Sequence, residues 1–149
     1  MRNIKKFLVT LMLPVLGASL MLGASNVFAE GAKHHKLVIQ VSTDDARTQA
    51  IALNNAVNIQ KLYGMDNIDL EIVAYGPGLS LLTKKSKESA RVKSLAMQNI
   101  TFSACGNTMA KIEKKTGKKP VLTEGVKVVP GGVARITELQ EDGYAYVRP

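Results

Sequence analysis

Residues 100–108 read Ile-Thr-Phe-Ser-Ala-Cys-Gly-Asn-Thr, and this stretch carries the main indication of the fold. Its first four residues, 100–103, are mostly apolar, β-branched or aromatic, which is typical of a buried strand. A Cys-Gly-Asn-Thr segment at 105–108 follows directly, and Met109 and Ile112 are then the apolar positions of a helix. The stretch therefore predicts a strand, a tight loop and a helix in immediate succession.

The same alternation of strand and helix continues on both sides of this stretch. Further strands are predicted at 36–42, 68–75, 126–129 and 144–147, helices at about 46–63, 89–97 and 133–141, and a short lysine-rich segment at about 79–86. Five strands separated by helices predict an α/β fold in which a mainly parallel sheet has helices on both faces.

The start of the chain has the pattern of a secretory signal peptide. A basic segment at 2–6 precedes residues 7–24, none of which is charged, and the small residues Val27 and Ala29 follow. This order predicts a signal peptide over residues 1–29 with cleavage after Ala29. An uncleaved anchor is the alternative, because the apolar run approaches the roughly 20 residues of a membrane span.

The remainder of the chain is expected to be one exported domain. A flexible N-terminus at 30–35 is predicted to precede a folded domain at 36–149, in the periplasm or outside the cell. No second apolar segment of spanning length follows, so we expect no stable membrane insertion after cleavage. A single cysteine among 149 residues excludes an internal disulfide and a cysteine-ligated zinc site of the usual kind.

The net charge is positive but does not predict nucleic-acid binding. The formal charge is +8, and it falls to +5 without residues 1–29, which hold three of the 20 basic residues and none of the 12 acidic ones. The lysines are scattered and not interleaved with aromatic residues, whereas a nucleic-acid interface gathers them on one face. A solvated, lysine-rich surface is the preferred interpretation.

The loops after the strands are all small, polar or rich in glycine. In a parallel sheet these loops lie at the edge formed by the carboxyl ends of the strands, where ligands bind. The residues expected to converge there are Thr43, Asp44, Gly76, Gly78, Cys105, Gly106, Asn107, Thr108 and Gly131. They predict one site, and the only thiol of the chain is part of it.

Cys105 is the candidate catalytic residue of this site. It lies where a strand ends and a helix begins, and the N–H groups of a helix N-terminus lower the pKa of a thiol. A thiolate can attack sulfane sulfur, hold it as a persulfide and pass it to another thiol. The alternative is a buried cysteine that behaves as a small apolar side chain. No metal and no cofactor is predicted.

Other residues have two interpretations each. Asp44 and Asp45 either bind a cation or cap the helix that follows, which is the commoner role. His34 and His35 either ligate a metal or are simply exposed near the predicted N-terminus. Arg135 either reaches the site or pairs with Glu138 at helical spacing.

Several motifs together resemble the DsrE/DsrF-like family, in particular its secreted branch of small single-domain proteins. These motifs are Thr43-Asp44-Asp45, Leu53-Asn54-Asn55-Ala56, the segments 73–79 and 102–109, and the C-terminal segments 129–135 and 139–149. The resemblance covers residues 36–149. It implies a three-layer α/β/α fold with a five-stranded parallel sheet, and assembly into trimers or hexamers.

The resemblance also implies a function. Members of the family relay sulfur as a persulfide on a cysteine in the strand-to-helix loop, and Cys105 occupies the matching position. We therefore expect a persulfide carrier whose partner is a thiol-bearing sulfur acceptor. The alternative is a ligand-binding or oligomeric assembly module in which Cys105 only packs, and a thiol-redox role through intermolecular disulfides is a third possibility.

Overall fold

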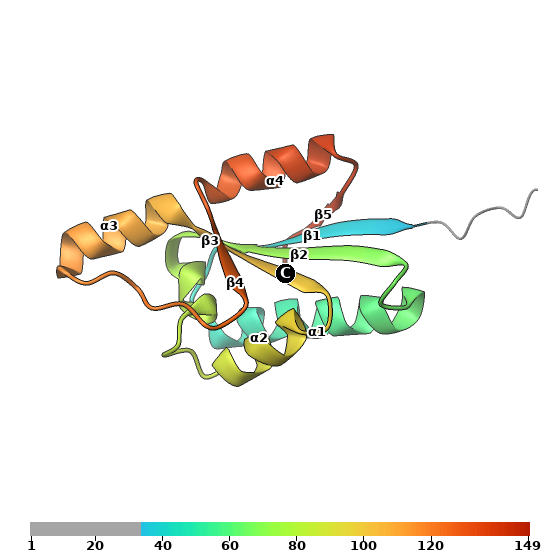
Figure 1. Ribbon diagram of the computed structural model, residues 1–149, viewed down its shortest axis with the longest axis horizontal. Coiled ribbons are helices and arrows are strands. Elements are labelled where there is room, and N and C mark those ends of the chain that lie inside the picture. Colours follow the sequence, from blue (N-terminus) through green and yellow to red (C-terminus); the bar gives the residue numbers. More distant parts are fainter. Residues whose placement is uncertain (1–33) are drawn as a thin grey trace, which may run out of the picture.

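The computed structural model describes residues 34–149 (Figure 1). The predicted signal peptide at 1–29 lies outside the described residues. The elements are β1 His35–Val41, α1 Ala46–Tyr63, β2 Ile68–Ala74, the 3₁₀ helix η1 Gly76–Leu82, α2 Ser89–Ala96, β3 Ile100–Cys105, α3 Gly106–Thr116, β4 Val126–Val129, α4 Gly132–Glu141 and β5 Ala145–Val147. All five strands lie within two residues of their predicted bounds. The segment from Gly76 begins a 3₁₀ helix instead of forming a simple turn.

The five strands form one parallel sheet in the order β4-β3-β2-β1-β5. This arrangement confirms the predicted α/β fold. All five strands point the same way, so their carboxyl ends meet at one edge, and β3, which ends in Cys105, lies between β2 and β4. The α1 and α2 helices cover one face of the sheet and α4 covers the other, which gives three layers (Figure 1).

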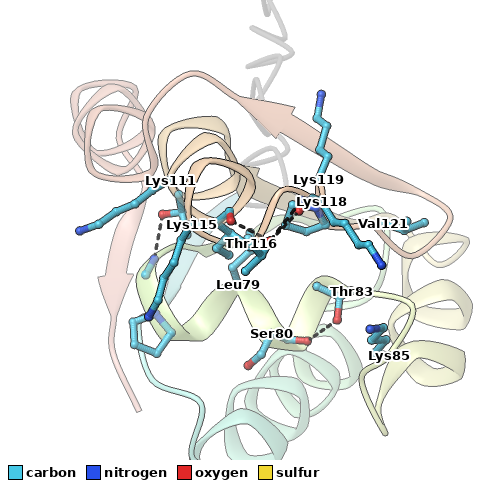
Figure 2. Close-up of a pocket in the computed structure, with 15 residues that line it drawn as sticks. Leu79, Ser80, Thr83, Lys85, Lys111, Lys115, Thr116, Lys118, Lys119 and Val121 are labelled. Carbon is cyan, nitrogen blue, oxygen red and sulfur yellow. Dashed lines mark hydrogen bonds between the residues drawn. The ribbon is translucent and has the colours of Figure 1, made fainter.

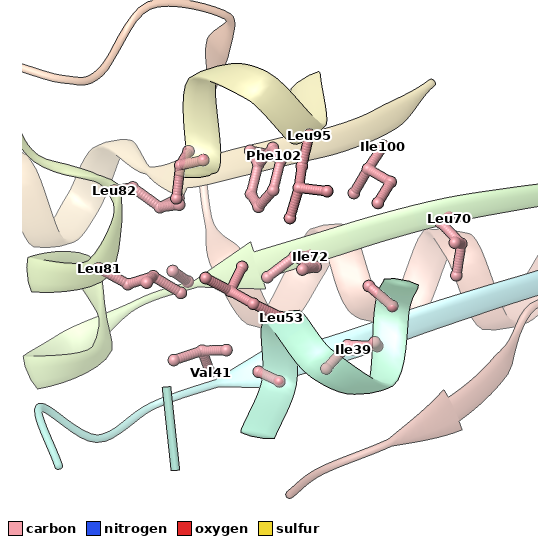
Figure 3. Close-up of a cluster of buried hydrophobic side chains, with 14 of the residues drawn as sticks. Ile39, Val41, Leu53, Leu70, Ile72, Leu81, Leu82, Leu95, Ile100 and Phe102 are labelled. Carbon is pink, nitrogen blue, oxygen red and sulfur yellow. The ribbon is translucent and has the colours of Figure 1, made fainter. Parts of the chain in front are cut away.

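The face under α1 and α2 holds the main hydrophobic core. Alternate strand residues point to opposite faces, and on this side they are apolar in all three central strands. Nineteen buried residues form the cluster, among them Ile39 on β1, Ile72 on β2 and Phe102 on β3 (Figure 3). Leu53 of α1 and Leu95 of α2 pack onto them from the helix layer.

The opposite face has a much smaller apolar cluster. Val38 and Val73 from the sheet pack against Ile136 and Leu139 of α4, and these four residues are the whole buried cluster. The helix α3 does not belong to this layer, since its Met109 is part of the larger core. The second face is therefore covered by one ten-residue helix.

Local sequence signals explain where the helices begin and end. Asp45 is the N-cap of α1, because its carboxylate accepts a hydrogen bond from the Thr48 N–H at 2.7 Å. The helix α3 ends at Gly117, which has a left-handed φ of 70°. Among residues 34–149, no helix has the length and apolar character needed to cross a membrane.

Candidate functional site

Cys105 is the last residue of β3 and the N-cap of α3. Its neighbours Phe102 and Ala104 point into the main core, so alternation along the strand directs Cys105 to the α4 side. The residue is only 5% exposed. The thiol is thus a buried group at the carboxyl edge of the sheet, at the start of one helix and on the side of another.

The surroundings of Cys105 favour its thiolate form. Burial raises the pKa of the thiol, whereas the Thr108 hydroxyl and the nearby backbone N–H groups of Thr108, Gly132 and Asn107 lower it. The donors outweigh burial, and the pKa of Cys105 lies below its ordinary value. These N–H groups belong to the first turns of both α3 and α4, so two helix N-termini stabilise negative charge on one sulfur.

The Thr108 hydroxyl connects this sulfur to the loop after β2. Its oxygen accepts a hydrogen bond from the Gly76 N–H at 3.0 Å, and the hydroxyl lowers the pKa of the Cys105 thiol. Gly76 has a φ of 55°, in the left-handed region that favours glycine. The Gly76 N–H therefore orients the Thr108 hydroxyl, which is one of the groups that lower the pKa of the Cys105 thiol.

Gly106, Asn107 and Gly131 bring the loop after β4 to the same place. The Asn107 N–H donates to the Pro130 carbonyl at 3.1 Å. A Cβ on Gly106 would lie 3.1 Å from the Val129 carbonyl oxygen, and one on Gly131 would lie 3.6 Å from Asn107 Nδ2. The short distance at Gly106 shows that glycine lets the start of α3 approach the end of β4 closely, whereas the distance at Gly131 is an ordinary van der Waals contact.

Comparison with known proteins gives a family and a fold relative. The sequence model of the DsrE/DsrF-like family matches residues 35–149. The chain belongs to this family. A solved structure, MTH1491 from Methanobacterium thermoautotrophicum, is described as a protein of unknown function. It is 31% identical, the similarity covers 77% of this chain and 99% of that one, and the TM-score is 0.70. No curated protein matches the chain.

Three of the predicted supporting residues of this DsrE-like chain lie in segments next to the Cys105 site. These residues are Thr43, Asp44 and Gly78. The Thr43 hydroxyl accepts a hydrogen bond from the Asp45 N–H at 3.2 Å, and the Gly78 N–H donates to the Tyr75 carbonyl at 3.1 Å. Asp44 is exposed, and its neighbour Asp45 caps α1. Gly76, Gly106, Asn107, Thr108 and Gly131 are the predicted residues that the structure brings to Cys105 and to the loops around it.

A buried ion pair lies under α4, on the same face of the sheet as Cys105. Glu71 of β2 is 4% exposed and binds Arg135 of α4 through two hydrogen bonds of 2.8 and 2.9 Å. The Ser103 hydroxyl donates to the same carboxylate at 2.7 Å. Glu138, the sequence-predicted partner, lies farther from Arg135, at 3.5 Å. Glu71 raises the pKa of Arg135, which stays charged.

The sequence did not single out Glu71 or Ser103, whereas Gly132 belongs to the loop after β4 that was expected at the site. Glu71 lies on the face of β2 opposite the main core, where an acidic residue of a strand ordinarily faces solvent. Its partner is 64 residues away, so no local spacing indicates the pair. Gly132 reaches the sulfur only because β4 pairs with β3 and so brings the start of α4 next to Cys105.

The two histidines are used in the fold. His34 pairs with Asp69 at 2.9 Å, and His35 begins β1 and stacks on Tyr63 with ring centroids 3.7 Å apart. No group of three or more potential metal ligands of the His, Cys, Asp or Glu type occurs within residues 34–149. Their observed contacts are thus an ion pair and a ring stack with neighbouring segments of the fold.

Proposed function

We propose that this DsrE-like protein carries sulfane sulfur on Cys105 as a persulfide and passes it to a partner thiol. The observation that supports this proposal is the position of Cys105, which ends β3 at the start of α3 and beside the start of α4, where backbone N–H groups and the Thr108 hydroxyl lower the pKa of its thiol. A persulfide anion carries its charge on the outer sulfur, one bond beyond the Cys105 sulfur, and the N-terminal ends of α3 and α4 favour negative charge near this position as well.

The transfer needs no second cysteine in the chain. The Cys105 thiolate attacks the outer sulfur of a donor such as thiosulfate, the S–S bond of the donor breaks, and sulfite leaves with the electron pair. A persulfide anion remains on Cys105. The thiolate of an acceptor then attacks its terminal sulfur, and Cys105 leaves as a thiolate. One neutral sulfur atom has moved, and neither step requires an external oxidant or reductant.

The setting of this chemistry is part of the proposal. The N-terminal pattern at 1–29 supports an exported protein, so the acceptor is a thiol-bearing protein of the periplasm or cell exterior. Val128 on the edge strand β4 and Val133 on α4 are 55% and 61% exposed beside the Cys105 site. This apolar surface supports a homo-oligomer, a trimer or hexamer, with the site close to the subunit contact.

A second candidate function follows from the burial of the thiol. Cys105 is 5% exposed, as expected of a cysteine that only packs within a ligand-binding or assembly module. Such a residue is alkylated slowly in the folded protein and takes up no sulfur. The two candidate functions therefore differ in one measurable property, the reactivity of Cys105 in the native state.

The test uses protein expressed from the whole 149-residue chain, incubated with thiosulfate or polysulfide and freed of excess reagent. Intact mass is recorded with and without reductant, and Cys105→Ser is the control. A reducible gain of one sulfur atom in the native protein alone is the expected result. Absence of the adduct, together with slow alkylation of folded Cys105, would overturn the carrier function in favour of the packing role.

A further inference from the structure

A large cavity lies beside the Cys105 site, between η1, α3 and the segment after α3 (Figure 2). Its volume is about 880 Å³, which lies within the range of small-molecule sites. Leu79 of η1, Ile112 of α3 and Val121 give it an apolar lining. The cavity is distinct from the thiol site, and the two share the Gly76–Thr108 wall.

The charged residues that line the cavity are all positive. Of its fifteen lining residues, five are lysines and none is acidic; the lysines are Lys85, Lys111, Lys115, Lys118 and Lys119. Within the part of the chain that the structure describes, no ion pair involves any of these five. A lining that carries positive charges and no acidic residue favours an anion over a cation.

The lysines come from opposite sides of the hollow. Lys111 and Lys115 are one turn apart on α3, while Lys85 follows η1 and lies across the cavity from them (Figure 2). Leu79 lies between these groups in the same view. An apolar body placed over Leu79 would therefore have cationic side chains within reach at more than one end.

We propose that this cavity binds an amphipathic organic anion, with an apolar chain or ring system and a carboxylate or sulfonate head group. A small inorganic anion would leave the apolar lining exposed to water, and a neutral apolar molecule would leave the lysines without a partner. Only a ligand with both parts matches both features of the lining. The site does not use the sulfur, so this inference stands apart from the persulfide chemistry.

The probe is laurate, added below its micellar concentration to protein expressed from the whole chain and followed by calorimetry. Dodecyltrimethylammonium, with the same alkyl chain and the opposite charge, is the comparison ligand. We expect laurate to bind with one site per chain and the cation to bind at least tenfold more weakly. Raising the salt from about 0.1 to 1 M shortens the Debye length from about 10 to about 3 Å and should weaken laurate binding.

Matched variants locate the site. Replacing two exposed lysines by glutamine, in Lys111→Gln with Lys115→Gln, should raise the Kd for laurate by about fivefold, from two partly screened charge pairs. The control is Lys87→Gln with Lys114→Gln, which removes the same charge from lysines outside the lining. Val121→Ser should raise the Kd about threefold, whereas Leu62→Ser, at an exposed apolar position outside the lining, should leave it unchanged.

The possible results separate this inference from its competitors and from the proposed function. Equal affinity for laurate and the cation, or equal loss of affinity in both lysine double variants, would overturn it. Binding of phosphatidylglycerol vesicles without binding of monomeric laurate would also overturn it and indicate a membrane surface instead. Cys105→Ser should bind laurate as the native chain does, so failure of sulfur transfer leaves the anion site standing.

Discussion

The two faces of the sheet are built from the same strands but hold different chemistry. Under α1 and α2, nineteen buried hydrophobic residues form a continuous core. Under α4, the apolar cluster has four members, and the central strands place Glu71, Ser103 and Cys105 on this side. One face thus supplies most of the burial that stabilises the fold, while the other positions polar and reactive groups.

This difference explains how one face of the sheet can hold both a buried thiol and an ion pair. The larger core holds β2 and β3 through Ile72 and Phe102 on the face under α1 and α2. The face under α4 therefore need not be apolar to keep the strands in register. Polar groups on the face under α4 are paired with each other, as Glu71 is with Arg135 and Ser103. A fully paired polar network fixes one arrangement of α4 over the sheet.

The largest expected effect comes from truncating the main core. Phe102 is completely buried among the nineteen residues, and Phe102→Ala should lower the free energy of unfolding by about 4 kcal/mol through lost burial and a residual cavity. Leu139→Ala, under α4, should cost about 2.5 kcal/mol, at the low end for such a truncation, because few apolar neighbours surround it. Urea unfolding of both variants measures the difference, and equal losses would contradict the division between the faces.

The buried ion pair should give the next largest effect. Glu71→Gln keeps the size of the side chain but leaves the Arg135 guanidinium without its anionic partner. Arg135 is 32% exposed at its side chain, so water compensates in part, and we expect a loss of about 2 kcal/mol in the free energy of unfolding. Glu138→Gln is the matched control. Its carboxylate is 59% exposed and 3.5 Å from Arg135, and it should cost less than about 0.5 kcal/mol.

The sequence predicted the helices, the strands and their order better than it predicted the contacts at the site. Strand and helix periodicities and the N-cap and glycine signals place every strand within two residues. The tight loop predicted at 105–108 is absent, because Cys105 ends β3 and Gly106 begins α3 directly. The 3₁₀ helix from Gly76 was not predicted, because Gly76, Pro77 and Gly78 also suit a turn. Local patterns therefore define the elements and their order along the chain.

What the sequence could not predict depends on contacts between distant segments. The Gly132 N–H reaches Cys105 through the pairing of β3 with β4, and Glu71 meets Arg135 across 64 residues. The lysines of α3 looked like a solvated surface, since the apolar wall that faces them comes from η1 and the segment after α3. None of these contacts can be recognised until the tertiary fold is known.

A smaller effect is expected where the second face meets the thiol. Thr108→Val removes the hydroxyl that donates to Cys105, which should raise the pKa of the thiol and slow its alkylation at neutral pH. Absorbance of the thiolate against pH gives the pKa directly. Thr137→Val is the matched control, because that hydroxyl donates to the Val133 carbonyl of its own helix at 3.1 Å. If both variants shift the titration alike, the Thr108 hydroxyl does not stabilise the thiolate.

The smallest effect is a pH dependence of stability that only the second face should show. The folded pKa of Cys105 lies below its ordinary value, so the native state binds a thiol proton less readily than the unfolded state does. The resulting stabilisation is fully present above the unfolded pKa of about 8.5 and is lost as the pH falls through the folded pKa. Relative to Cys105→Ser, the native chain should therefore gain stability between about pH 7 and pH 9. Phe102→Ala should keep the same slope, because it removes no titrating group. A flat difference between native protein and Cys105→Ser would show that folding leaves the pKa of the thiol unchanged, and a loss of stability as the pH rises would show that the folded thiol stays neutral and only packs.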